Sequence, residues 1–262
     1  MSTQQNPSTT RVALVTGAAQ GIGRAIALRL ATDGLDVAVD DLPAHSGLLD
    51  TLVEEIVRIG RKAVALTSDV SKEEEVRAMV ASTVSALGRL DVMIANAGVG
   101  AGGRLLVMDA DVEEWEKRWE VNIRGVLLCY KYAARQMVAQ GGGGRIIGAS
   151  SICGLRGYAG VGGYCVSKAA VRSLTQTAAL ELREHSITVN AYAPGAIDTR
   201  MIAKEGDKLH HPGFVVKQAF KIPDVRTGQP ADVAALVSFL ASPESHFITG
   251  QTVSVDDGVH FA

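Results

Sequence analysis

Short apolar runs rich in valine and isoleucine recur along the chain, and each is followed by a longer segment whose apolar positions return every three to four residues. Runs of the first kind are typical of buried strands, and segments of the second kind are typical of helices. Their alternation predicts parallel strands joined by helices. The runs expected to form strands are 12–16, 36–40, 63–67, 92–95, 145–149, 188–191 and 252–255.

The segments expected to form helices are 21–32, 48–59, 72–87, 112–139, 163–184 and 230–240. Because the strands are mainly apolar, we expect helices to bury both faces of their sheet. Right-handed crossovers then leave a crevice at the carboxyl ends of the strands, where the strand order reverses and ligands bind. The pattern predicts an α/β protein with a Rossmann-type doubly wound parallel sheet in three α/β/α layers.

Residues 11–262 carry this pattern, and we expect them to form one Rossmann-fold domain, since α/β domains of this length are common. Residues 1–10 are polar and are predicted to be a flexible N-terminal tail. The stretch 200–227 has weak periodicity and two prolines, and it follows a predicted strand directly. Such a segment at the ligand-binding edge predicts a mobile substrate lid.

Composition and charge narrow the possible partners. Lysine and arginine total 26 against 28 aspartates and glutamates, and no basic block suits nucleic acid. The chain starts without an apolar signal run and has no stretch of about eighteen apolar residues, so we expect a cytoplasmic protein without membrane contact. The three cysteines lack CxxC spacing and the histidines lack HExxH spacing, so we expect no catalytic metal.

A glycine-rich turn joins the first strand to the first helix. Glycines at a sharp turn let phosphates approach the backbone, and the N–H groups of the helix start favour an anion. The spacing GxxxGxG differs from the usual dinucleotide pattern GxGxxG, and a tight structural turn is the alternative. The residues of this turn expected to bind a dinucleotide are Gly17, Gln20, Gly21, Ile22 and Gly23.

Asp40 and Asp41 end the second strand, about twenty residues beyond the glycine turn. A carboxylate there accepts hydrogen bonds from the adenosine ribose of NAD but repels the 2′-phosphate of NADP. Gln20 also supplies no cation for that phosphate. NAD is therefore favoured over NADP. Neighbouring residues of a strand point in opposite directions, so one aspartate faces the ribose, and we expect this to be Asp41, just beyond the strand.

Polar and small residues follow the third and fourth strands at the same edge of the sheet. We expect them to contact the adenine and the adjoining ribose, although Asp69 suits a helix N-cap almost equally well. These residues are Asp69, Val70, Asn96, Ala97 and Gly98.

The segment after the fifth strand carries a candidate catalytic group. Tyr164 and Lys168 are four residues apart and share one face of a helix. An adjacent ammonium favours the phenolate, so we expect Lys168 to lower the pKa of Tyr164 from its usual value near 10. Ser151, at a strand end, can hold the substrate oxygen from a second direction while Tyr164 transfers a proton.

The TGxxxGIG turn, the Asn96-Ala97-Gly98 sequence and the spacing of Ser151, Tyr164 and Lys168 resemble the classical short-chain dehydrogenase/reductase family over nearly the whole chain. The resemblance implies hydride transfer between a nicotinamide and a secondary alcohol or ketone. It implies that Asn122 is a fourth catalytic residue, holding a water that links Lys168 to solvent.

The resemblance also implies further cofactor contacts and a homotetramer. The expected contacts with the nicotinamide and nearby phosphates are Pro194, Gly195, Ile197 and Thr199. The expected subunit interfaces are the helix 163–184 and the last strand. Asp257 departs from the family pattern because it replaces a glycine of V-D-G-G, and we expect it to alter a subunit contact.

The stretch from Ser242 to Gln251 resembles the acetoin/diacetyl reductase (butanediol dehydrogenase) branch, which implies a small vicinal diketone or hydroxyketone as substrate. Polyols, sugars and 3-oxoacyl thioesters are alternatives, and a non-catalytic NAD(H) sensor is an alternative of another class. Cys165 is interpreted as a small packing residue. The residues expected around the substrate are Ser151, Cys153, Leu155, Tyr158 and Tyr164.

Overall fold

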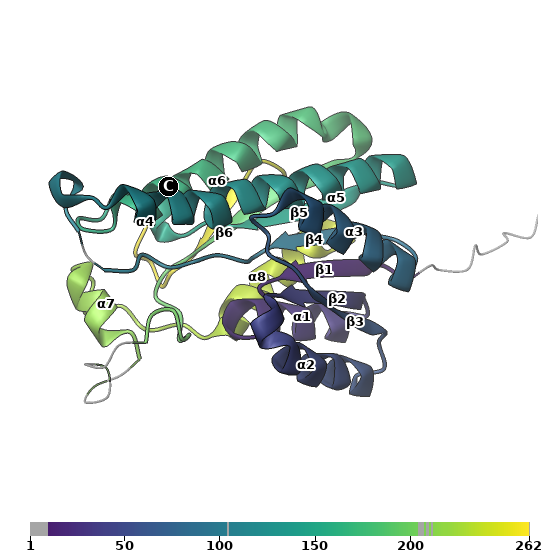
Figure 1. Ribbon diagram of the computed structural model, residues 1–262, viewed down its shortest axis with the longest axis horizontal. Coiled ribbons are helices and arrows are strands. Elements are labelled where there is room, and N and C mark those ends of the chain that lie inside the picture. The colour runs from purple at the N-terminus through teal and green to yellow at the C-terminus, as the bar shows by residue number, and fades with distance from the viewer. Residues whose placement is uncertain (1–9, 104, 204–206, 208–209, 211, 262) are drawn as a thin grey trace, which may run out of the picture.

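The protein forms one seven-stranded parallel sheet (Figure 1). The structure, a computed structural model, describes residues 10–103, 105–203, 207, 210 and 212–261, so the predicted tail lies outside them apart from Thr10. The strand order is β3-β2-β1-β4-β5-β6-β7, which confirms the doubly wound fold. The strands are β1 (Val12–Thr16), β2 (Asp36–Asp41), β3 (Ala63–Thr67), β4 (Val92–Ala95), β5 (Gly144–Ala149), β6 (Ile187–Pro194) and β7 (Thr252–Val255).

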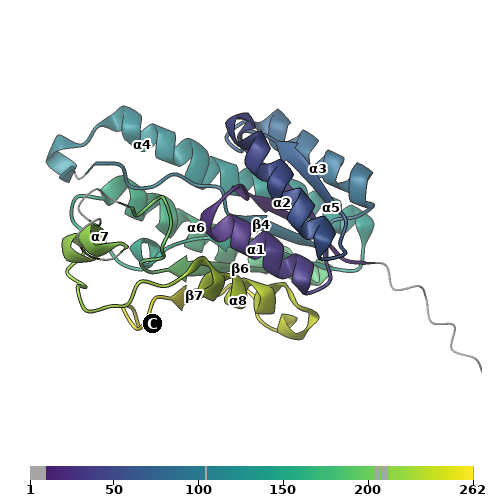
Figure 2. The same cartoon turned by 90° about the horizontal axis from the view of Figure 1, so that it is seen from below.

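Helices cover both faces of the sheet (Figures 1 and 2). One face is covered by α1 (Gly21–Thr32), α2 (Ser46–Arg58) and α8 (Pro230–Ala241). The other face is covered by α3 (Glu73–Leu87), α5 (Val126–Gln140) and α6 (Gly162–Glu181). Two short helices, α4 (Val112–Trp119) and α7 (Phe214–Ala219), complete the set, and α7 lies past the carboxyl ends of the strands.

Alternation along the central strands builds two apolar cores, one on each side of the sheet. In β1, Ala13 and Val15 pack under α1 and α8, whereas Leu14 packs under α3 and α5. The strands are in register at their carboxyl ends, where Thr16 pairs with Asp40 and Ala149 pairs with Tyr192. The residues that follow these strands therefore meet at one edge.

Four expectations about elements need correction. The edge strands β3 and β7 are only half-buried, because each lacks a neighbour on one side in the single chain. β2 includes Asp41, and Ser151 follows the end of β5 by two residues. The predicted helix 112–139 is divided by a π-helical turn at Glu120–Gly125, because its backbone hydrogen bonds there span five residues.

Candidate active site

The glycine turn after β1 is closely packed and held from the side. Gly17 has a φ of +64°, which favours glycine, and a Cβ on Gly23 would lie 2.2 Å from the Gly17 carbonyl oxygen. Asn96 donates from Nδ2 to the carbonyl oxygens of Thr16 (2.8 Å) and Gly17 (3.1 Å) and accepts from the Tyr192 hydroxyl. The Asn96 side chain thus supports the turn, and its contact with a cofactor stays a prediction.

The loop after β6 lies against the same turn. A Cβ on Gly21 would come within 3.3 Å of the Thr199 side chain, and Arg200 donates to Gln20 Oε1 at 3.1 Å. Residues about 180 positions apart in sequence thus border one cradle, which supplies bare backbone, the start of α1 and a guanidinium. These are the groups that bind a pyrophosphate, so the cradle fits a dinucleotide.

The two aspartates at the end of β2 diverge as predicted. Asp41 accepts hydrogen bonds from the Ala19 N–H (3.0 Å), from the Leu42 N–H (2.8 Å) and from His45 Nδ1 (2.8 Å), which fixes its carboxylate beside the glycine turn. Asp40 is fully buried and accepts from the Ser68 hydroxyl at 2.7 Å. Burial raises the pKa of Asp40 to about 8, so this carboxyl is protonated at neutral pH.

The residues after β3 have structural partners. Asp69 accepts from the backbone N–H and the hydroxyl of Ser71, which shapes the turn before α3, while Lys72 is the N-cap residue. The alternative prediction that Asp69 is the helix N-cap is therefore wrong, because the N-cap lies three residues later. Val70 is buried against Gly125, where a Cβ would come within 2.9 Å of it. Their cofactor contacts stay predictions.

Three segments meet around the Lys168 ammonium. Lys168 Nζ donates to the Ala149 carbonyl oxygen at 2.9 Å, and a Cβ on Gly98 would lie 3.3 Å from Nζ and 3.1 Å from Asn122 Oδ1. Asn122, in the π-helical turn, exchanges two hydrogen bonds with the Val99 backbone. Burial lowers the pKa of Lys168 to about 8, which keeps most of its charge at neutral pH.

Tyr164 and Ser151 lie next to this lysine. Lys168 Nζ is 5.6 Å from the centre of the Tyr164 ring. The expectation that Lys168 lowers the pKa of Tyr164 is wrong for the protein alone, because burial raises that pKa, while the neighbouring Ser151 hydroxyl acts in the opposite direction. The Ser151 hydroxyl also accepts from the Cys153 N–H at 3.2 Å. The Tyr164 phenol is thus neutral at pH 7, and its role as proton donor stays a prediction.

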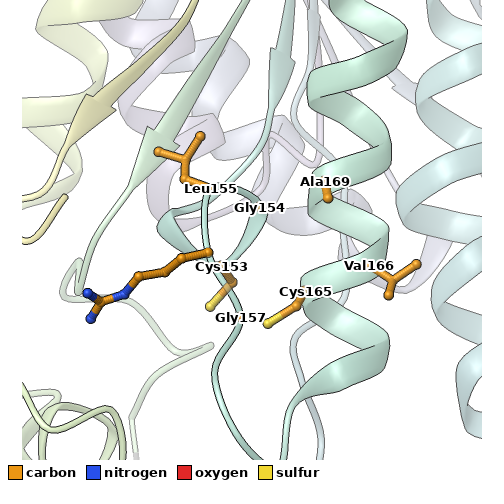
Figure 3. Close-up of a pocket in the computed structure, with 8 residues that line it drawn as sticks. Cys153, Gly154, Leu155, Gly157, Cys165, Val166 and Ala169 are labelled. Carbon is orange, nitrogen blue, oxygen red and sulfur yellow. The ribbon is translucent and has the colours of Figure 1, made fainter. Parts of the chain in front are cut away.

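The expected substrate residues border an apolar cluster that reaches the segment 200–227. The mobility of this lid segment stays a prediction, and its residues 204–206, 208, 209 and 211 lie outside the described part of the chain. Tyr158 stacks on Phe220, which follows α7, with ring centres 4.4 Å apart. Cys153 and Cys165 are buried in this cluster, with Tyr158 and Tyr164 packed against it. Beside it, Cys153, Leu155 and Cys165 line a pocket of about 260 Å³ (Figure 3).

The β6 end and the C-terminal segment close the site on another side. Pro194 is the last residue of β6, and a Cβ on Gly195 would lie 2.9 Å from the Asp256 side chain. Ile197 is buried in the core against α8. Whether these residues border a nicotinamide stays a prediction.

Two arginines near the site have structural roles that were not predicted from the sequence. Arg118 is buried and donates to the carbonyl oxygens of Gly100 (3.2 Å) and Ala101, which braces the loop after β4. Arg226, at the end of the lid segment, pairs with Asp257. One signal for Arg226 was present in the sequence, namely the departure of its partner Asp257 from the family pattern. Asp257 was expected to alter a subunit contact, whereas in this structure it pairs with Arg226 of the same chain.

The described part of the chain offers no metal site and no membrane-spanning helix. Within it, no three histidine, cysteine or acidic side chains are placed to hold a metal ion. None of its helices has the length and apolar character needed to cross a membrane.

Comparisons with known proteins agree with this geometry. The family model described as enoyl-(acyl carrier protein) reductase matches residues 17–260. A short-chain dehydrogenase/reductase of Armillaria gallica is 48% identical over 253 residues, 96% of each chain. The chain belongs to the short-chain dehydrogenase/reductase family. As a member, it is an oxidoreductase that acts on CH–OH groups.

Relatives within the family differ in substrate. An (S)-acetoin-forming diacetyl reductase of Staphylococcus epidermidis is 42% identical, over 95% of this chain and 98% of the relative. A 3-oxoacyl-(acyl-carrier-protein) reductase of Staphylococcus aureus is 40% identical, over 96% and 98%. The solved acetoin dehydrogenase of Salmonella typhimurium is 34% identical, with a TM-score of 0.83 over 95% of both chains. A metagenomic blue fluorescent protein in complex with NADPH is 32% identical, with a TM-score of 0.85 over 96% and 98%.

Proposed function

We propose that this short-chain dehydrogenase/reductase uses NAD(H) to interconvert a secondary alcohol and a ketone, with a small vicinal diketone or hydroxyketone such as diacetyl or acetoin as substrate. One observation carries the proposal. The hydroxyls of Ser151 and Tyr164 lie together beside the Lys168 ammonium, at the sheet edge that also holds the glycine cradle.

The cradle and Asp41 support NAD as the cofactor. The bare backbone of the turn binds the pyrophosphate, and the Asp41 carboxylate accepts hydrogen bonds from the adenosine ribose. A 2′-phosphate at that place meets the negative charge of Asp41, while the nearby Arg24 is paired with Glu55 at 2.6 Å. NADP is disfavoured for this reason.

In reduction, a dinucleotide held in the glycine cradle would supply the hydride for the carbonyl carbon. Tyr164 donates its phenolic proton to the substrate oxygen, and Ser151 donates a hydrogen bond to the same oxygen. Lys168 holds the cofactor ribose and places a positive charge beside the phenol as it loses its proton. Asn122 holds the loop at Val99 and the water that returns a proton toward Lys168. Oxidation reverses these steps.

Similarity and the apolar cluster support the substrate. The diacetyl reductase and the acetoin dehydrogenase are both related along nearly the whole chain. The cluster that receives the substrate is lined by uncharged side chains such as Ile152, Cys153 and Val161. A second candidate, reduction of a 3-oxoacyl thioester, is favoured by the relative that is 40% identical.

The test is the oxidation of NADH, and then of NADPH, with diacetyl, acetoin, a ketose, a polyol in the reverse direction and an acetoacetyl thioester. We expect diacetyl and NADH to give the highest kcat/KM, and the variant Tyr164→Phe to lose turnover by about 1000-fold or more while it still binds NADH. A higher kcat/KM with the acetoacetyl thioester would contradict the small diketone as substrate and favour a 3-oxoacyl thioester. NADH binding without turnover of any compound would favour a sensor over an enzyme.

A further inference from the structure

Two of the three cysteines face each other beside the catalytic residues. Cys153 comes from the 3-10 turn Ile152–Gly154, two residues after Ser151, and Cys165 comes from α6, directly after Tyr164. Figure 3 shows their sulfur atoms pointing toward one another, and each thiol shifts the pKa of the other. Both residues line the pocket of about 260 Å³, so a small oxidant can reach them.

The two thiols differ in acidity. The neighbouring Cys153 thiol lowers the pKa of Cys165, whereas the Cys165 thiol and burial raise the pKa of Cys153. A thiolate next to a thiol is the arrangement of an attacking and a resolving cysteine. Cys129, fully buried on α5 in the other core, has its pKa raised by burial and serves as an internal reference.

We propose that Cys153 and Cys165 are a modification site at which a hydroperoxide forms a reversible disulfide, and that this bond inhibits the neighbouring active site. The inhibition rests on the proposed function, whereas formation of the bond does not.

The chemistry balances with hydrogen peroxide as the oxidant. The Cys165 thiolate attacks one peroxide oxygen, the O–O bond breaks, and Cys165 becomes a sulfenic acid as hydroxide leaves and takes up a proton. The Cys153 sulfur then attacks the Cys165 sulfur and releases a second water. Two thiols lose two electrons, and one peroxide becomes two waters. An external dithiol reverses the change by disulfide exchange.

The turn that carries Cys153 is coupled to the catalytic groups. The Cys153 N–H donates to the Ser151 hydroxyl, and a Cβ on Gly154 would lie 2.5 Å from the Lys168 carbonyl oxygen. A covalent S–S bond is shorter than the contact between two separate thiols, so it draws this turn toward α6. Ser151 then leaves its position beside Tyr164.

The experiment is a tryptic peptide map of the purified full chain. Cleavage after Arg145, Arg156 and Lys168 leaves Cys153 and Cys165 on separate peptides. After one equivalent of hydrogen peroxide and alkylation of the remaining thiols, we expect a cross-linked pair 146–156 with 157–168 in the monomer band. Cys129 should be alkylated, and dithiothreitol should remove the cross-link. Alkylation of all three cysteines, or a cross-link to Cys129, would overturn the site.

The second readout is turnover, expressed for each variant relative to its own untreated rate. We expect the wild type to lose roughly tenfold or more of its rate with peroxide and to recover it with dithiothreitol. With peroxide, Cys153→Ser and Cys165→Ala should keep their own untreated rate and should give no cross-linked peptides. Cys129→Ala should behave like the wild type. A cross-link without loss of rate would refute the inhibition. An untreated protein without turnover would refute the proposed function, and the peptide map would still decide the disulfide.

Discussion

Asp40 and Asp41 are neighbours at the end of β2 with opposite surroundings. The Asp41 carboxylate accepts three hydrogen bonds, one of them from Ala19 in the glycine turn, whereas the Asp40 carboxyl is fully buried under Ser68. Burial raises the pKa of Asp40 to about 8, so its side chain is neutral at pH 7. The two positions therefore offer a matched pair for separating cofactor selection from stability.

We expect Asp41→Ala to narrow the preference for NADH over NADPH by about tenfold or more, because it removes hydrogen bonds to the ribose and the charge that repels a 2′-phosphate. The measurement is kcat/KM for both cofactors. Asp40→Asn keeps the size and neutrality of the buried group, so it should leave the ratio unchanged. If only Asp40→Asn shifts the ratio, the ribose ligand is Asp40.

Asp40 should also make the stability of the protein depend on pH. Its pKa is about 8 in the folded state and near 4 in the unfolded state, so between these values the folded state binds more protons. The free energy of unfolding therefore falls as pH rises from about 4 to about 8. Asp40→Asn removes this dependence. In urea unfolding, the Asp40→Asn variant should be more stable than the wild type at pH 8 and equally stable at pH 4. If the free energy of unfolding depends on pH in the same way for both proteins, Asp40 is not a buried neutral group.

Sequence reasoning works at this scale where spacing alone brings groups together. Tyr164 and Lys168 share a helix face through their four-residue separation, and Ser151 follows a strand whose end could be located. It fails where burial decides the chemistry. Neither the neutral state of Asp40 nor the raised pKa of Tyr164 could be predicted, because both depend on tertiary packing.

At the scale of elements, strands with continuous apolar runs were the easiest to predict, because their length and turn residues set their bounds. The π-helical turn at Glu120–Gly125 was not predicted, because its six residues are too few to show a periodicity of their own between two ordinary helices. That turn carries Asn122, so the element that was missed is the one that positions a candidate catalytic side chain.

Close packing between elements predicts a large effect at Gly23 and a small one at Gly47. A Cβ on Gly23 would lie 2.2 Å from the Gly17 carbonyl oxygen, so Gly23→Ala must displace α1 from the turn. We expect its NADH affinity to fall by about tenfold or more. A Cβ on Gly47, in α2, would meet nothing within 4 Å. Gly47→Ala should leave binding unchanged and stabilise the protein by roughly 0.5–1 kcal/mol. The measurement is a fluorescence titration with NADH. If Gly23→Ala and Gly47→Ala bind NADH with equal affinity, the glycine turn is not part of the cofactor site.

At the scale of the molecule, contacts between distant segments complete the site. Arg200 reaches Gln20, and Arg226 at the end of the lid segment holds Asp257, which keeps a φ of +55° that glycine adopts more easily. The sequence predicts the sheet edge where these segments meet, because the crossover rules fix the strand order. It does not predict the pairs themselves, since no short-range spacing links residues this far apart.

We propose that four copies of the chain associate, as the family resemblance implies, and that they meet at the outer faces of α5 and α6, where apolar side chains stay exposed. Leu127 and Leu180 are among them, and Leu180 is 68% exposed. Light scattering should give about four times the 27.5 kDa of one chain. Leu180→Glu places a charge in the contact and should reduce the assembly to smaller species. The control Val57→Glu, at a 55% exposed position of α2, should keep four copies. A monomeric wild type, or equal dissociation of both variants, would mean that the α6 face is not an interface.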